Sequence, residues 1–156
     1  MNACLPHHLS RSAKIALSWL AVAVMAAAIF WMSANTGESI SSGLGIISAI
    51  KGMLSAGAQW IFGHEVDVSP VGHFTEYLVF GALLFNALRF HLNPRTALLA
   101  ALAIGSLYGM TDEWHQLFVP SRSCDPADWA VDTVATLVGS ALTRFGFRKT
   151  KTPNDK

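Results

Sequence analysis

Long apolar runs separated by short polar segments predict an all-α chain. Residues 15–32 contain eighteen residues without a charged side chain. As a helix rising about 1.5 Å per residue they would span roughly 27 Å, close to the hydrocarbon thickness of a bilayer. Arg11 and Lys14 precede this run, as in a secretory signal. The run is longer than the roughly 7–15 residues of a signal core, and more apolar segments follow, so we expect a retained first membrane helix.

Three further helices are predicted in the second half of the chain. The first covers residues 73–91, with an apolar run at 78–88 and charges ordered to suit the helix dipole. Asn93-Pro94 forms a turn, so the next helix, from about 95 to 114, should return antiparallel. Its uncharged core, 96–111, is slightly short for a span, and its Gly105-x-x-x-Gly109 spacing fits close helix packing. The last helix should begin near Pro126 and continue to about residue 147.

Residues 46–62 have a different pattern. Apolar side chains recur near helical spacing, with Lys51 and Gln59 among them and several glycines interrupting the run. This is typical of an amphipathic helix that lies in the membrane interface rather than one that crosses. Polar loops are expected on both sides of it, at 33–45 and 63–70.

The distribution of charge predicts a topology of four transmembrane helices plus that interfacial helix. With both termini cytoplasmic, nine of the eleven basic residues fall inside, and only Lys51 and Arg122 fall outside. This follows the positive-inside rule. The chain then divides into a cytoplasmic basic leader (1–14), a transmembrane domain (15–147) and a disordered cytoplasmic tail (148–156). The rival is a soluble all-α domain with three buried helices, which the short third segment favours.

Composition agrees with a small polytopic membrane protein. Charged residues are 13% of the chain, about half the usual fraction of roughly 25%, and the mean hydropathy is +0.39. A net charge of +1 gives no argument for nucleic-acid binding. Cys4 and Cys124 would lie on opposite sides of the membrane and would not pair. The sequence names no cofactor and predicts no oligomeric state; the partners it indicates are membrane lipids and an amphiphilic envelope ligand.

Polar side chains gather where three of the predicted helices reach the outer face. Five of the ten acidic residues lie between Gly109 and Asp132. Asp128 and Asp132 are four apart and share one helix face, and Asp132 lies one to two turns inside, where an ionisable group is costly unless it has partners. The candidate set is His73, Glu76, Tyr77, Asp112, Glu113, His115, Gln116, Arg122, Asp128 and Asp132.

Four interpretations of this set are open. It could be a structural hydrogen-bonded network in which Arg122 pairs with a carboxylate and His73 bonds another. It could be a polar pocket for a lipid headgroup or an amphiphilic envelope molecule, with Trp114, Phe118 and Trp129 as its apolar wall.

The third interpretation is acid/base or metal-assisted hydrolysis, for which His73, His115, Asp112, Glu113 and Asp132 have suitable side chains. The local spacing matches no strong metal motif, because Asp-Glu-x-His lacks a second His at helical spacing, so no metal ligand is assigned. No phosphate-binding loop or nucleophile elbow is present. The fourth interpretation is a proton or ion path. The inner halves of the helices contain no acidic residues, so no continuous relay is visible.

Three segments of the chain resemble the VanZ-like family of membrane proteins. They are His73-Phe-Thr-Glu76-Tyr77, then Asp112-Glu113-Trp-His-Gln116-Leu-Phe-Val-Pro120-Ser-Arg122, then Asp128-x-x-x-Asp132. The segment Trp31-Met-Ser33-Ala-Asn is similar to that family's first loop. The resemblance covers about residues 15–145.

The resemblance implies a multi-pass protein of the plasma (inner) membrane and cell envelope. The family's named member is linked to low-level resistance to the glycopeptide teicoplanin, and the motif residues carry over as important without chemical roles. The chain departs from the family in two places. Ser69-Pro70-Val71 stands where basic residues usually precede the His, and Ala135 stands where a Gly is common.

Overall fold

The computed structural model describes residues 9–34, 53, 59, 69–120 and 122–150. Within them the chain forms four α-helices and no strand: α1 (Arg11–Ser33), α4 (Ser69–Leu88), α5 (Pro94–Gln116) and α6 (Pro126–Thr150). The predicted all-α class is confirmed. The interfacial helix expected at 46–62 lies outside the described residues except for positions 53 and 59, as do most of the leader and the end of the tail.

Short polar side chains set where the helices begin. The Ser10 hydroxyl accepts a hydrogen bond from the Ala13 amide, and the Asn93 side chain accepts from two amides at the start of α5. The Asp125 carboxylate accepts from the Ala127 amide at 2.8 Å at the start of α6. Each cap replaces a hydrogen bond that the first turn of a helix cannot make internally. Pro94 and Pro126 follow two of these caps, at the first helical position that proline tolerates.

Several helix boundaries differ from the sequence-based expectation. Helix α1 begins at Arg11 instead of residue 15, and α4 ends at Leu88 instead of residue 91. Helix α4 begins at Ser69, because Pro70 sits in the first turn, where its missing N–H costs nothing. His73 therefore lies one turn inside the helix instead of at its start. Helix α6 continues through Arg148 to Thr150, beyond the expected end near residue 147.

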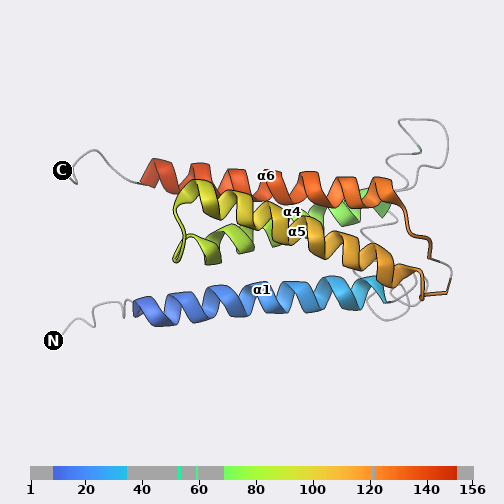
Figure 1. Cartoon of the computed structure of the whole chain (residues 1–156), viewed down its shortest axis with the longest axis horizontal. Helices are drawn as coiled ribbons and strands as arrows, with labels where there is room; N and C mark the ends of the chain where they lie inside the picture. The colour runs from blue at the N-terminus through green and yellow to red at the C-terminus, as the bar shows by residue number, and fades with distance from the viewer. Residues whose placement is uncertain (1–8, 35–52, 54–58, 60–68, 121, 151–156) are drawn as a thin grey trace.

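Successive helices run antiparallel, so α1 begins and α6 ends at the same end of the bundle (Figure 1). Helix α4 is central: it contacts α1, α5 and α6, whereas α1 makes only a minor contact with α5. Its large buried side chains, Tyr77, Phe80, Leu84 and Phe85, form the core together with Ile29 of α1. At the opposite end, α1 and α5 finish where α4 and α6 start, which brings four helix ends together (Figure 1).

Glycines allow α4 and α6 to cross at very short range. A Cβ on Gly139 would overlap the Leu78 carbonyl, and a Cβ on Gly81 would overlap the Thr136 carbonyl. The Ser140 hydroxyl donates to the Gly81 carbonyl at 2.9 Å across the same contact. Small residues of this kind are how membrane helices bring their backbones close.

The predicted glycine pair of α5 also lies against α6. A Cβ on Gly105 would overlap the Thr136 side chain, and one on Gly109 would come within 3.2 Å of the Asp132 carboxylate. Close packing at this spacing is therefore confirmed. It also places Asp132 directly against the α5 backbone.

Two of the described helices are long and apolar enough to cross a membrane: Arg11–Ser33, with a mean hydropathy of 2.2, and Val71–Leu88, with 1.3. Helices α5 and α6, with 23 and 25 residues, are long enough but are not apolar enough to meet the same criterion. Their outward faces are nonetheless apolar. The exposed large hydrophobic residues on them include Leu99, Ile104, Leu107, Met110, Val134, Leu137, Leu142 and Phe145.

Candidate functional site

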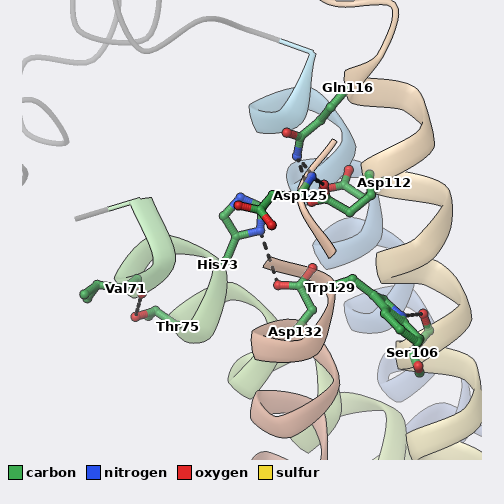
Figure 2. Close-up of polar contacts among 10 residues, drawn as sticks. Val71, His73, Thr75, Ser106, Asp112, Gln116, Asp125, Trp129 and Asp132 are labelled. Atoms are coloured by element: carbon green, nitrogen blue, oxygen red, sulfur yellow. Dashed lines mark hydrogen bonds and ion pairs between the residues drawn. The ribbon is translucent and has the colours of Figure 1, made fainter. Parts of the chain in front are cut away.

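Polar side chains of α4, α5 and α6 converge at the end of the bundle where α1 and α5 finish (Figures 1 and 2). We call six of them the acidic cluster. Its members are His73, Glu76, Asp112, Glu113, Asp128 and Asp132. His73, Asp112, Glu113 and Asp132 are buried, and Glu76 and Asp128 are half-buried. Burying this many ionisable groups is unfavourable unless they are paired with one another or with a bound group.

His73 and Asp132 form the contact that links α4 to α6 within the cluster. The His73 Nδ1 lies 3.2 Å from the Asp132 Oδ1, and Asp132 is fully buried. Figure 2 shows the two side chains pointing toward each other from neighbouring helices. The second oxygen of Asp132, Oδ2, is buried without a hydrogen-bond partner among the described residues. Buried carboxylate oxygens are rarely left this way, so this one calls for an explanation.

The last turn of α5 supplies a second group of polar side chains. Gln116 Nε2 lies 3.4 Å from both an Asp112 oxygen and a Glu113 oxygen, which makes two long, weak hydrogen bonds. The other Glu113 oxygen accepts a hydrogen bond from the Asp125 amide at 2.8 Å. That amide belongs to the residue that caps α6, so Glu113 is oriented by the start of the neighbouring helix.

Three residues of the acidic cluster have ligand atoms close enough to hold a metal ion. One such atom each from His73, Glu113 and Asp128 lies within 4.8 Å of the others. The three come from α4, α5 and α6, and no two of them are closer than 15 positions in the chain. A search for a local metal motif in the sequence cannot find such a set.

Glu76 and Tyr77 lie one turn further along α4. Glu76 is within electrostatic range of His73, Asp112 and Asp132. Tyr77 is fully buried, with its ring edge-on to Phe80 at 6.1 Å between centroids. Its hydroxyl is buried without a hydrogen-bond partner among the described residues. The cluster therefore has a second unpartnered polar atom near it.

Two other predicted site residues lie within electrostatic range of the cluster, Arg122 of Glu76 and His115 of Asp112, and both also contact α1. The His115 ring contacts the Phe30 ring, with 4.4 Å between centroids. The Arg122 guanidinium donates to the Met32 carbonyl at 3.5 Å, which links the loop between α5 and α6 to the end of α1. Neither residue belongs to the group of three that could hold a metal ion.

Helix α1 and Asp125 contribute to the site in ways that were not predicted from the sequence. Ser33, the last residue of α1, is buried beside Asp112. It had been assigned to a loop, although the family-like Trp31-Met-Ser33 segment was a signal for it. Asp125 acts through its backbone amide, which no side-chain motif could indicate.

The three aromatic residues predicted to wall the site lie in the last turn of α5, in the segment that follows it and in the first turn of α6. Trp114 and Phe118 are 65% and 75% exposed, and Trp129 is 40% exposed. Figure 2 shows Trp129 on α6 with its ring lying toward α5, where its indole N–H donates to the Ser106 carbonyl at 3.0 Å. Trp129 therefore has a packing role, whereas Trp114 and Phe118 project outward.

The chain matches the family model VanZ/LLP1 over residues 18–147. This chain belongs to the VanZ/LLP1 family. A search of curated proteins and a search of solved structures found no match. The VanZ resemblance drawn from the motifs is confirmed. Together with the two apolar helices, family membership supports a membrane protein.

Proposed function

We propose that this VanZ-like protein is a four-span protein of the plasma membrane, with both termini cytoplasmic and the acidic cluster facing the envelope. The antiparallel order of the four helices supports this layout, because an even number of crossings returns the chain to its starting side (Figure 1). Helices α5 and α6 would reach about 34 and 37 Å at a rise of about 1.5 Å per residue, enough to cross. Their exposed apolar faces suit contact with lipid.

In this layout the acidic cluster binds the polar part of an amphiphilic envelope component. The observation that carries the proposal is the pair of buried, unpartnered polar atoms, Asp132 Oδ2 and the Tyr77 hydroxyl. A folded protein loses stability by leaving such groups unpaired, and a bound molecule would supply the missing hydrogen bonds. Exposed Trp114 and Phe118 lie near the same place and would contact the apolar part of the ligand.

The charge of the cluster indicates the ligand chemistry. Five of its six members are carboxylic acids, which as carboxylates only accept hydrogen bonds. The complementary headgroup would therefore carry ammonium groups or sugar hydroxyls. A glycopeptide of the teicoplanin type, which the family resemblance suggests, belongs to this class of amphiphile.

An alternative is hydrolysis of a lipid-linked phosphate or ester. The observation in its favour is the hydrogen bond between His73 and Asp132, because a carboxylate that orients a His is a common arrangement for acid/base chemistry. This function predicts turnover by the purified protein. An Asp132→Asn variant that loses turnover but still binds the ligand would favour hydrolysis over binding alone.

Cysteine labelling in intact cells tests the topology. Cys124 is exposed, and it lies in the loop between α5 and α6. A Cys4→Ser variant leaves it as the single native reporter of that loop. The matched reporter is Leu92→Cys in a protein with both native cysteines replaced, since Leu92 is exposed in the turn between α4 and α5. A membrane-impermeant reagent should label Cys124 and not the cysteine at 92; the reverse pattern would put the acidic cluster in the cytoplasm and contradict the proposal.

A thermal-shift panel tests ligand binding. The purified full-length protein would be heated in mixed micelles with teicoplanin, an aminoacyl lipid, a glycolipid and a polyprenyl phosphate. A ligand of the native state raises Tm by mass action. We expect a shift with an amino- or sugar-bearing amphiphile that Asp132→Asn abolishes. No shift with any panel member, or equal shifts in both proteins, would contradict binding at the acidic cluster.

A further inference from the structure

We propose that His73, Glu113 and Asp128 bind a divalent transition-metal ion at the acidic end of the bundle. The proposal goes beyond the amphiphile-binding function and does not depend on it. It rests on the positions of three ligand atoms, on the groups that orient them, and on the unpaired polar atoms around them.

The geometry of the three ligand atoms is close to that of a metal site. They lie within 4.8 Å of one another. Metal–nitrogen and metal–oxygen bonds of about 2.0–2.2 Å place neighbouring ligand atoms roughly 3–4 Å apart. The observed limit of 4.8 Å is wider than this spacing. Rotation of the half-buried Asp128 side chain, in the first turn of α6, would bring its carboxylate closer to the other two ligand atoms. The backbone positions of three helices therefore already suit an ion.

The groups behind the ligands match those found around protein metal sites. A metal-binding His almost always uses its other ring nitrogen to contact a carboxylate or a carbonyl, which fixes the ring. Asp132 occupies the Nδ1 side of His73, so Nε2 is the nitrogen left for the ion. Glu113 is likewise held through Oε2 by the Asp125 amide at 2.8 Å, and its Oε1 has only the long 3.4 Å contact with Gln116, which an ion would replace.

An independent observation is a buried carboxylate oxygen of the cluster that has no hydrogen-bond partner in the described part of the chain. Asp132 is fully buried, and its Oδ2 has no partner among the described residues. The acidic cluster contains five carboxyl groups and one imidazole, and Arg122 acts electrostatically on Glu76 at its edge. A divalent cation held by His73, Glu113 and Asp128 would offset the repulsion that remains between the carboxylates.

The ligand types indicate which ions would bind. Mg²⁺ and Ca²⁺ prefer oxygen ligands alone, whereas a His nitrogen with two carboxylates suits Zn²⁺, Mn²⁺ or Fe²⁺. Three protein ligands also leave at least one coordination position open. A bound ion would therefore present a positive site to water or to an anionic headgroup, and would change the ligand preference of the acidic cluster.

The test is equilibrium binding of Zn²⁺ and Mn²⁺ to purified, tag-free, full-length protein. The protein would be stripped with a chelator, and binding would be followed by competition with a metal-sensitive dye. Bound metal would then be counted by elemental analysis. His7, His8 and His64 are replaced by Ala in every protein used, because each could bind zinc on its own. We expect one equivalent of Zn²⁺ and no competition from millimolar Mg²⁺.

Substitutions assign the binding to the proposed ligands. Glu113→Gln and His73→Ala should each weaken Zn²⁺ binding at least 100-fold. Asp132→Asn, which changes only the group that orients His73, should weaken it about 10- to 100-fold. The matched controls are His91→Ala at the far end of the bundle and His115→Ala, which lies against Phe30. Both controls should bind as the parent does.

Two results would overturn the proposal. One is less than 0.2 equivalents of metal in a parent protein that elutes as a single folded species. The other is binding that survives Glu113→Gln, or that is lost in His115→Ala. Glu113→Gln keeps the size of the side chain, so it separates loss of a ligand from loss of the fold. The amphiphile thermal shift is measured separately, so failure of either proposal leaves the other testable.

Discussion

The two ends of the helix bundle both contain polar side chains, but they use them differently. At the basic end, where α1 begins, Asn86 donates to the Ser18 hydroxyl at 3.0 Å and accepts from the Arg89 guanidinium at 2.9 Å. Ser18 in turn donates to the Lys14 carbonyl at 2.8 Å. These contacts form an unbroken chain from α1 to α4.

The basic end is also held by aromatic side chains. The Arg89 guanidinium lies 3.7 Å from the centre of the Phe147 ring and 4.6 Å from that of Phe90. Arg11 donates to the Phe90 carbonyl at 3.2 Å, which ties the start of α1 to the end of α4. Cation–π contacts and hydrogen bonds thus use the charges of this end for packing.

At the acidic end the polar groups are more numerous and less satisfied. Buried side-chain atoms without a partner among the described residues include Asp132 Oδ2, the Tyr77 hydroxyl and His115 Nδ1, all at or near this end. None lies among the residues of the basic end. The same fold can therefore satisfy its polar groups, and the several left unsatisfied at one end support the ligand site proposed there, at a cost in stability.

We expect the largest loss of stability from a substitution where α4 crosses α6, a contact that supports both ends of the bundle. Gly139→Ala would force a Cβ into the Leu78 carbonyl, so we expect the free energy of unfolding to fall by about 3 kcal/mol. The matched control is Gly146→Ala in the same helix, where nothing lies within 4 Å. It should be neutral or stabilise by up to about 1 kcal/mol. Equal effects of the two substitutions in reversible detergent unfolding would contradict the packing of α4 on α6.

The second-largest effect should be on ligand binding, and it should be confined to substitutions at the acidic end. Asp132→Asn should weaken binding of the amphiphile that gives the largest thermal shift by at least about tenfold, because hydrogen bonds to a charged acceptor are the strong ones. Asn86→Ala should leave that binding unchanged. Titration of each purified variant in mixed micelles measures both affinities. Loss of binding in both would mean that the ends are not independent.

The basic end should respond in stability instead. Asn86→Ala removes one hydrogen bond to Ser18 and one to Arg89, so we expect a loss of about 1–2 kcal/mol in the free energy of unfolding. Asn86→Asp, which can still accept from Arg89, should lose less. Detergent-unfolding curves of the two variants give the comparison, and an unchanged midpoint in Asn86→Ala would refute a structural role.

The smallest effect concerns the exposed aromatic residues. Trp114→Ala should weaken amphiphile binding only a few-fold, because the indole ring would contact only the apolar part of the ligand. The substitution should leave the free energy of unfolding unchanged. Leu99→Ala is the control, since Leu99 is equally exposed on α5 but lies near the basic end. A larger effect of Leu99→Ala on binding would place the apolar part of the ligand elsewhere.

The sequence predicted most of the fold because helix signals are local. The Asn93-Pro94 turn, the first-turn proline Pro126, the apolar runs and the glycine spacing each depend on neighbouring residues. The start of α4 was misplaced because Pro70 can end a loop or begin a helix equally well. Helices α5 and α6 are less apolar than α1, so four crossings stay a prediction.

The candidate site was predictable in composition but not in geometry. Motifs named nearly all of its side chains, yet the pairing of His73 with Asp132 depends on how α4 and α6 cross. The grouping of His73 with Glu113 and Asp128 depends on three helices at once. Local spacing argued against a metal ligand set, because it examines one segment at a time.

The most direct test of the central claim is the paired replacement His73→Leu/Asp132→Val. If the acidic end is kept for a ligand, apolar residues of similar size should hold or raise the free energy of unfolding, because the costly buried charges are removed. Binding of the panel amphiphile should be lost at the same time. A variant that still binds, or one whose unfolding free energy falls as far as that of Gly139→Ala, would show that this pair serves the fold and would contradict the account.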